Sequence, residues 1–410
     1  MLLTGMIVSR IFSPEASAAS LRLDAVREAL LRGGVDISVL TTNPPPGIEV
    51  KSDRKVVRVP VLRDSEGYIK GYASYASFDL QAFVRVLTSP RVDFLLVEPP
   101  PTTGAVMRVA STIRRIPYFW YAADVWSDAT DGMDVPNVVK KVVRGLEKFA
   151  IRGADGCIAV SDGVAQRVID MGARSVEVVP NGADTKIFNP YVEPLYADEL
   201  EAMGVREPFF IYAGTASQWQ GADLFAKAFE RLWDTYEGDA QLLYLTRGDS
   251  IPALKQIAER LERVARDRGK DYSPLLVHST VSASLAARWQ RQALASCVSI
   301  QPGIGYDFAY PTKVLTSLSC GTPVIYAGAG PANDDILDYN LGRSVPYDEK
   351  SVAKAMEELL SQYSNADEDL WDKEALHQWV KDNRSMESTG LQVAQYIFDR
   401  LKKKDSRLIG

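Results

Sequence analysis

Residues 156–190 decide the fold of this chain. They read Gly156-Cys-Ile-Ala-Val-Ser161, then a helical pattern to Gly172, then Val176-Glu-Val-Val-Pro-Asn181-Gly182-Ala-Asp184, and they end in Phe188-Asn-Pro190. The first apolar run ends in Ser161, which suits a helix N-cap, and a second apolar run follows the helix. Asn181-Gly182 then predicts a sharp turn. The segment is therefore predicted to be a strand, a helix and a second strand that stop at a turn near the middle of the chain.

The length and composition are typical of a two-domain globular protein. A chain of 410 residues is too long for one ordinary core and predicts two domains of about 200 residues each. The net charge of −6, without a long basic block, argues against a nucleic-acid-binding protein. Lys402-Lys-Lys404 is interpreted as a solvated tail, and the alternative is a patch for peripheral membrane contact.

The cysteines and the apolar runs point to a cytoplasmic location. Cys157, Cys297 and Cys320 are far apart in apolar or small-residue surroundings, so we expect buried thiols in a reducing compartment rather than a disulfide or metal site. The first residues lack a basic segment and read as a strand instead of a signal peptide. No apolar run approaches the roughly 20 residues that span a bilayer.

Apolar runs alternate with helical patterns in both halves, which predicts parallel sheets with right-handed crossovers. Strands are expected at 3–9, 35–41, 57–62, 93–98, 117–122, 156–160 and 175–179, and then at 208–213, 240–246, 274–278, 297–301, 323–327 and 343–346. Helices are expected at 17–33, 77–88, 102–115, 136–153 and 162–171, and then at 221–236, 251–268, 282–295, 311–319, 350–361 and within 370–402.

The stretch 187–208 interrupts this rhythm with Pro190, Pro194 and Pro208, and we interpret it as the connection between domains. The predicted fold is α/β, with two doubly wound Rossmann-like domains facing a cleft. The predicted boundaries are 1–186 for the first domain, 187–384 for the second, and 385–410 for a terminal helix that packs back on the first domain. Ligands of such sheets bind outside the carboxyl ends of the strands.

Two loops of the second half suit an anion. Phe210-Ile-Tyr-Ala-Gly214 leads through a polar loop to a helix start after Gly221, where helix amides favour phosphate, although an ordinary turn fits equally. The stretch from Gln301 to Tyr310 forms a glycine-rich loop, and Pro311 suits the first helical position. Amides of 309–312 and the charge of Lys313 could hold a diphosphate, the alternative being a surface lysine.

The order and spacing of these motifs resemble the retaining GT-B glycosyltransferases of the large group 1 type, or family 4, which build bacterial polysaccharides and glycans. The matching residues are Asn181-Gly182, Asp184, Phe188 and Pro190, then Gly214 and Gly221, then Pro311, Lys313, Gly321 and Pro323, together with Ser13-Pro14-Glu15, Arg22, Leu30 and Gly33 near the start. Asp124-Val-Trp126-Ser resembles the Asp-Leu-Trp-Pro motif of one subgroup. The resemblance covers nearly the whole chain.

This resemblance implies a nucleotide-sugar donor on the second domain, a glycan, lipid-linked or small-molecule acceptor on the first, and retention at the anomeric carbon. It implies no metal and no cofactor other than the nucleoside diphosphate sugar as co-substrate. The donor residues carried over are Asn181, Thr215, Gln220, Gly221, Arg247, His278, Ala309, Tyr310, Lys313 and Thr316. The acceptor or phosphate-loop residues are Glu15, Ser17, Ala18, Arg22 and Trp126, and Asp124 is placed at the catalytic site.

The chain departs from the family pattern at several of these positions. Ser17-Ala18 replaces two adjacent glycines, and Thr215 and Gln220 replace an Arg and a Lys, for which Arg247 could partly substitute. The positions of two family glutamates hold Phe308 and Thr316, and the second glutamate usually binds the ribose. A threonine makes a weaker hydrogen bond to a hydroxyl than a carboxylate does.

Some residues keep a plain structural alternative. Asp124 follows the strand at 117–122 and could orient the acceptor, or it could cap a helix or turn. His278 ends a strand where the base would lie, and a lone histidine there could equally be structural. Trp126 and Trp219 could stack on a ligand. Core packing suits Trp120 better.

Two rival functions remain open at this stage. The missing Arg, Lys and Glu could mark a catalytically silent homologue that serves as a partner subunit. Another two-domain nucleotide-sugar enzyme, such as an epimerase, could share the scaffold. The sequence does not identify the sugar, the base, the acceptor or the oligomeric state.

Overall fold

The computed structural model describes residues 2–15, 17–45, 48–50, 52–64, 69, 71–131, 136–216, 220–304, 307, 309–365 and 371–409. The chain divides into two compact units. The N-terminal unit consists of Met1–Asn181 together with Met386–Gly410, and the C-terminal unit consists of Gly182–Ser385. The boundaries predicted at 186 and 384 lie near these divisions.

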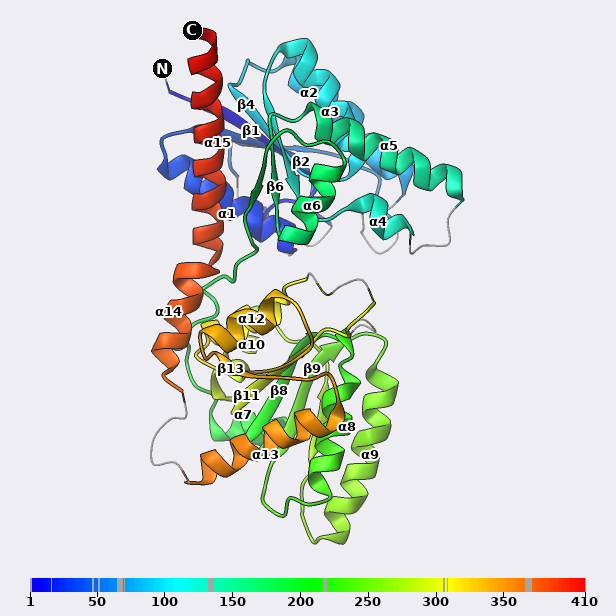
Figure 1. Cartoon of the computed structure of the whole chain (residues 1–410), viewed down its shortest axis with the longest axis vertical. Helices are drawn as coiled ribbons and strands as arrows, with labels where there is room; N and C mark the ends of the chain where they lie inside the picture. The colour runs from blue at the N-terminus through cyan, green and yellow to red at the C-terminus, as the bar shows by residue number, and fades with distance from the viewer. Residues whose placement is uncertain are drawn as a thin grey trace. The chain divides into compact units, whose positions relative to one another are not determined.

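A seven-stranded parallel sheet forms the centre of the N-terminal unit (Figure 1). Its strands are β1 (Thr4–Val8), β2 (Asp36–Thr42), β3 (Val56–Val59), β4 (Phe94–Val97), β5 (Tyr118–Ala122), β6 (Gly156–Ala159) and β7 (Val176–Val178). Their spatial order is β3-β2-β1-β4-β5-β6-β7, and β1 pairs with both β2 and β4. The strand order therefore reverses between β1 and β4, and the carboxyl ends at this point form the usual ligand crevice of a doubly wound sheet.

Helices cover both faces of this sheet, which is why its central strands are apolar at every position. The helices are α1 (Ala18–Arg32), α2 (Tyr72–Thr88), α3 (Pro101–Arg114), α4 (Trp126–Asp131), α5 (Asn137–Gly153), α6 (Asp162–Asp170) and α15 (Met386–Ile409). One face packs against α1 and α15, and the other packs against α2, α3, α5 and α6. The terminal helix α15 contacts α1, as expected for a helix that returns to the first domain.

The C-terminal unit is built on a six-stranded parallel sheet. Its strands are β8 (Phe209–Thr215), β9 (Gln241–Arg247), β10 (Leu275–His278), β11 (Ala295–Ser299), β12 (Val324–Ala327) and β13 (Gly342–Val345). Their order is β10-β9-β8-β11-β12-β13, so the order reverses between β8 and β11. The helices are α7 (Ala197–Ala202), α8 (Asp223–Trp233), α9 (Ile251–Asp267), α10 (Ala283–Gln292), α11 (Thr312–Ser319), α12 (Pro331–Asp338), α13 (Glu349–Asn365) and α14 (Lys373–Asn383).

The predicted strands agree with the structure in number, order and parallel pairing. The short helices α4, α7 and α12 were not predicted, because six or eight residues hold too little periodicity to be recognised. The helical stretch expected within 370–402 is two helices, α14 and α15. Ser161 caps α6 by accepting a hydrogen bond from the amide of Val164, as predicted.

The sharp turn predicted at Asn181-Gly182 is wrong. Neither residue is in a turn, and Gly182 does not adopt a positive φ. Asn181 instead ends the N-terminal unit, with its side chain held by Arg22, and Ala183 forms a parallel bridge with Ser385.

The cysteines Cys157, Cys297 and Cys320 are buried and unpaired, as predicted. Among the described residues, no group of three or more His, Cys, Asp or Glu side chains is arranged to hold a metal ion. Within the same part of the chain, no helix combines the length and the apolar character needed to cross a bilayer.

Candidate functional site

A cavity of about 240 Å³ opens at the carboxyl ends of β8 and β9 in the C-terminal unit. Its wall is completed by the amino end of α11 and by α10, so it lies at the edge where doubly wound sheets bind ligands. The lining residues are Phe188, Ala213, Gly214, Thr215, Leu245, Thr280, Val281, Ala286, Gln290, Thr312, Lys313 and Thr316. Of the predicted donor residues, the structure brings Thr215, Lys313 and Thr316 together here.

Among the residues that the structure describes, Lys313 is the only charged one that lines this cavity. Its side chain is half-buried against Gly214, where a Cβ would lie 2.8 Å from the Lys313 Cε and where φ is +122°. The Nζ lies 5.1 Å from the centroid of the Tyr212 ring and has no ion pair among the described residues. Desolvation by the surrounding protein lowers the pKa of Lys313 to about 8. A diphosphate in the cavity would supply the missing negative charge.

Hydroxyl and amide groups supply the rest of the polar lining. Gln290, which is buried, donates hydrogen bonds from Nε2 to the Thr316 Oγ1 and the Ser317 Oγ, both at 3.2 Å. Thr316 in turn donates to the carbonyl of Lys313 at 3.2 Å. The sequence analysis missed Gln290, which carries no motif and reaches the cavity only because α10 packs against α11.

Arg247 lies beside Thr215 at the carboxyl edge of the same sheet, since the two residues pair in the register of β8 and β9. Its side chain is exposed and has no ion pair or hydrogen bond among the residues that the structure describes. Its carbonyl accepts a hydrogen bond from the amide of Ala216, so the backbone that carries it is fixed. Arg247 is therefore an uncommitted cation next to the cavity.

Gln220 and Gly221 have local structural roles and do not line the cavity. Gly221 has φ +58°, and a Cβ there would lie 1.8 Å from the hydroxyl of Tyr347, so a larger residue would be strained and would displace the Tyr347 side chain. The Oε1 of Gln220 accepts hydrogen bonds from Tyr212 and Thr215, each at 3.5 Å. These contacts tie Gln220 to the last residues of β8.

His278, Ala309 and Tyr310 also lie outside the lining of the cavity. The Nε2 of His278 is 3.1 Å from the carbonyl of Met203, which matches the structural alternative for this residue. The guanidinium of Arg384 lies 4.6 Å from the Tyr310 ring centroid, and Tyr310 packs on the apolar cluster around α11 and α14. Trp219 and Phe308 lie outside the described residues.

Pro311 is the N-cap of α11 rather than its first residue, with φ −68° and ψ 123°. Thr312 is therefore the first helical residue, and it lines the cavity. Because the first amides of a helix have no intrahelical partner, the helix end offers donors toward an anion. The described part of the chain leaves open space at this end instead of covering it.

A second polar site occupies the carboxyl ends of β1 and β4 in the N-terminal unit. Arg22 is buried and forms an ion pair with Glu98 at 2.5 Å, while its other terminal nitrogen donates to the Asn181 Oδ1 at 3.1 Å. Glu98 also accepts a hydrogen bond from Ser9 at 2.9 Å. Desolvation alone would lower the pKa of Arg22, but Glu98 with Tyr121 and Asp124 outweighs it and raises the pKa. Glu98 therefore neutralises Arg22 inside the protein, and Asn181, predicted as a donor residue, accepts a hydrogen bond from Arg22. A phosphate contact of Arg22 stays a prediction.

Asp124 is exposed two residues beyond the end of β5. Surrounding protein desolvates its carboxyl and raises its pKa, while Arg22 opposes that shift. Asp124 does not cap α4, because Glu147 accepts the amides of Trp126 and Ser127, each at 2.9 Å. Because Glu147 supplies this cap, the carboxylate of Asp124 is not used to cap α4 in the described structure.

Arg10 is a polar residue that the sequence analysis missed. It lies two residues after β1 and is buried, with its guanidinium 3.9 Å from the Tyr75 ring centroid and 5.9 Å from that of Trp126. Its Nε and Nη1 have no hydrogen-bond partner in the described ranges of the chain. Trp126 contacts Tyr75 edge-to-face at 6.1 Å, so it belongs to this cluster. The sequence offered one indication of this residue: Arg10 follows the buried strand β1, which lies where the strand order of the sheet reverses.

The first loop of the chain is committed to local contacts. Glu15 pairs with Arg63 at 3.2 Å. Ser17 is the N-cap of α1, where its Oγ accepts the amide of Ser20 at 3.0 Å. Ala18 is the first residue of α1. Of these residues, Ser17 stabilises the start of α1.

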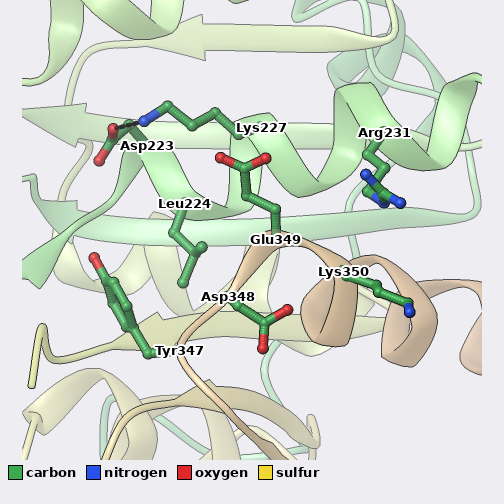
Figure 2. A pocket seen from close by; sticks show the side chains of 8 residues that line it. All are labelled: Asp223, Leu224, Lys227, Arg231, Tyr347, Asp348, Glu349 and Lys350. Carbon is green, nitrogen blue, oxygen red and sulfur yellow. Dashed lines mark ion pairs between the residues drawn. The ribbon is translucent and has the colours of Figure 1, made fainter.

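A larger cavity of about 440 Å³ lies on the other side of the C-terminal sheet, along α8 and the start of α13 (Figure 2). It is lined by Asp223, Leu224, Lys227, Arg231, Tyr347, Asp348, Glu349 and Lys350, and Lys227 pairs with Asp223 at 2.8 Å. The equal numbers of acidic and basic side chains offset each other and give no net attraction for a diphosphate. The smaller cavity at Lys313 is the better candidate, because its charge is of one sign and its position is at the strand ends.

Comparison with known proteins agrees with this geometry. The profile of the glycosyl transferase 4-like domain matches residues 18–182, and that of glycosyl transferases group 1 matches residues 207–362. The two matches together support a glycosyltransferase of the group 1 family. No curated protein sequence matches it.

Solved structures of similar fold cover nearly the whole chain. The sucrose-phosphate synthase of Thermosynechococcus elongatus is 15% identical with a TM-score of 0.66, and the match covers 97% of this chain and 98% of the other. Alr3699/HepE of Anabaena, solved in complex with UDP-glucose, is 13% identical with a TM-score of 0.61, covering 97% and 100%. A putative UDP-N-acetylglucosamine 2-epimerase of Listeria monocytogenes is 12% identical with a TM-score of 0.59, covering 98% of both chains. At these identities the likeness concerns the fold.

Proposed function

We propose that this group 1 glycosyltransferase moves a sugar from a nucleoside diphosphate sugar to a glycan, lipid-linked or small-molecule acceptor, with retention at the anomeric carbon. The observation that carries the proposal is Lys313, a desolvated cation without a counter-ion beside the open amino end of α11. The Anabaena protein of the same fold was solved with UDP-glucose, which supports a nucleotide-sugar donor.

The chemical task is to stabilise the diphosphate as the glycosidic bond breaks. Lys313, the amides at the start of α11 and Arg247 would take up the negative charge that develops on this leaving group. Lys313 and the amides of α11 are held by the fold before the reaction, whereas the exposed side chain of Arg247 would be ordered by the bound diphosphate. No metal or additional cofactor enters the proposal.

Asp124 is proposed as the reactive-site carboxylate of the N-terminal unit, orienting the acceptor hydroxyl. Its support is an exposed carboxylate at the end of β5 that is not used to cap α4. The raised pKa of Asp124 would make it a better proton acceptor than an ordinary surface aspartate.

Calorimetric titration with UDP, GDP, ADP and dTDP tests the donor half of the proposal. We expect at least one nucleoside diphosphate to bind, and Lys313→Met to weaken that binding while the nucleoside alone binds unchanged. Lys255→Met, on an exposed lysine of α9, is the matched control. If no nucleoside diphosphate binds, the protein is a silent homologue that acts as a partner subunit.

The second candidate function is epimerisation of a nucleotide sugar. Its basis is the similar fold of the UDP-N-acetylglucosamine 2-epimerase structure from Listeria. Incubation with a UDP-sugar separates the two reactions, because an epimerase yields an isomeric UDP-sugar without an acceptor. A transferase releases UDP and forms a glycoside or, slowly, the free sugar. Formation of an isomeric sugar nucleotide would replace the transferase proposal by an epimerase.

A lipid-linked acceptor would require the protein to work at a membrane surface. Peripheral membrane contact from the cytoplasmic side therefore belongs to the same proposal.

A further inference from the structure

Arg10 is a buried cation just beyond the carboxyl end of β1 that has no part in holding the diphosphate. It is 8% exposed, and its Nε and Nη1 are enclosed without a hydrogen-bond partner among the residues that the structure describes. Burial lowers the pKa of Arg10 although Tyr75, Asp79 and Glu98 act in the opposite direction. A buried charge without a partner costs free energy, so this arrangement calls for a functional explanation.

The carboxylates around Arg10 are committed elsewhere. Glu98 forms an ion pair with Arg22 at 2.5 Å. Asp79 of α2 attracts Arg10, but its Oδ1 accepts a hydrogen bond from Thr103 at 2.5 Å. Arg22, at the same edge of the sheet, therefore has a carboxylate partner, whereas the Nε and Nη1 of Arg10 meet no acceptor in the described ranges.

The amino end of α2 lies beside the guanidinium of Arg10. The Arg10 Cζ is 3.9 Å from the centroid of the Tyr75 ring, and Tyr75 is the fourth residue of α2. Helical side chains lean toward the N-terminus, so this ring, with Arg10 on it, lies over the first turn. The N-cap of α2 is Gly71, with φ 89° and no side-chain hydrogen bond to the turn. The first amides of α2 therefore favour an anion, as Arg10 does.

Two aromatic rings orient Arg10. Trp126 packs edge-to-face on Tyr75 with the ring centroids 6.1 Å apart, and the Arg10 Cζ lies 5.9 Å from the Trp126 centroid. Stacking fixes the plane of a guanidinium and leaves its N–H edge for a bidentate contact with a carboxylate or phosphate. Both rings are half-buried, so part of each can contact a sugar face.

We propose that Arg10 and the amino end of α2 bind an anionic group, a phosphate or a carboxylate, on the sugar acceptor. The carboxyl ends of β1 and β5 lie at one edge of the parallel sheet, so this site shares its edge with Asp124. Trp126 follows Asp124 by two residues, which suits one acceptor whose hydroxyl is oriented by Asp124 and whose charge is held by Arg10. This role rests on the proposed function and narrows its acceptor to one that carries an acidic sugar.

Calorimetric titration of the full chain with glucose 6-phosphate, glucuronate and glucose tests this site. The two acids distinguish a phosphate from a carboxylate, and glucose lacks the charge. We expect at least one acid to bind and glucose to give no measurable heat. Arg10→Gln removes the charge and should weaken acid binding by about 10- to 150-fold, the range for losing a hydrogen bond to a charged group.

Two further variants assign the effect to the guanidinium. Arg10→Lys keeps the charge but loses the planar fork, so it should weaken acid binding less than Arg10→Gln does. It also keeps the test available if Arg10→Gln is unfolded by circular dichroism. Arg85→Gln, at an exposed arginine of the same helix, is the matched control and should bind the acid as the wild type does.

Three outcomes would overturn the proposal. They are that neither acid binds, that acid binding survives both Arg10 variants, or that it is lost in Lys313→Met instead, which would place the acid in the donor cavity. Titration with nucleoside diphosphates separates this failure from that of the donor proposal. A protein that binds a nucleoside diphosphate but neither acid rejects the acidic acceptor alone, whereas absent diphosphate binding rejects the donor proposal.

Discussion

Replacing Lys313 by methionine should stabilise the free protein and weaken its binding of nucleoside diphosphate. Methionine keeps most of the apolar length of the side chain that packs on Gly214 and Tyr212 but removes the ammonium group. The two effects have opposite signs because the ammonium has no counter-ion among the described residues of the free protein and would gain one in the complex.

The lowered pKa gives the size of the first effect. A fall from 10.5 to about 8 corresponds to about 3 kcal/mol at 1.36 kcal/mol per pKa unit, which is an upper bound for a half-buried group. We therefore expect Lys313→Met to gain about 1–3 kcal/mol in free energy of unfolding at neutral pH. Loss of a hydrogen bond to a charged phosphate should weaken binding by about 1.5–3 kcal/mol, or roughly 10- to 150-fold.

The pH dependence follows from the sign of the shift. Between pH 8 and 10.5 the unfolded chain binds more protons at Lys313 than the folded chain, so the wild type gains stability as pH rises through this window. The advantage of Lys313→Met should be full below about pH 8 and should vanish above about pH 10.5. A bound diphosphate would raise the pKa of Lys313, so nucleotide binding near pH 8 to 9 should take up protons.

Urea unfolding of both proteins at several pH values measures the stability, and calorimetry in buffers of different ionisation enthalpy measures the proton uptake. Lys255→Met is the matched control, with neither effect expected. A Lys313→Met variant that is less stable than the wild type, or that binds the diphosphate equally well, would refute the reasoning.

Three further predictions test other parts of the structure. Asp124→Asn should lower turnover with little change in donor affinity, and steady-state kinetics showing unchanged turnover would remove Asp124 from the reactive site. Gly221→Ala should lose about 1–3 kcal/mol in urea unfolding, because φ is +58° and the new Cβ meets the Tyr347 hydroxyl, and Tyr347→Phe should restore part of that loss; no destabilisation would contradict the close approach. Glu98→Gln should cost about 3 kcal/mol of stability, since it leaves the buried charge of Arg22 without its partner, and a loss too small to measure would mean that Arg22 finds another anion.

The fold was predictable because its signals are local. In a doubly wound sheet each strand is buried on both faces, so Phe94-Leu-Leu-Val97 and its counterparts are apolar runs separated by helical patterns. These patterns predicted the strands, their order along the chain and their parallel pairing. Elements with weak periodicity, such as the six-residue α4 and α7, gave no comparable signal.

The sequence by itself also predicted the location of the donor site, because Pro311 and Lys313 indicate a helix start after a glycine-rich loop. Only the tertiary structure decided which polar residues are committed and which remain available. It placed Glu98 against Arg22, Glu147 on the amides of α4, and Gln290 beside the cavity. The physical reason is that a polar or charged side chain pairs with whichever partner the fold brings near. These partners come from segments far apart along the chain.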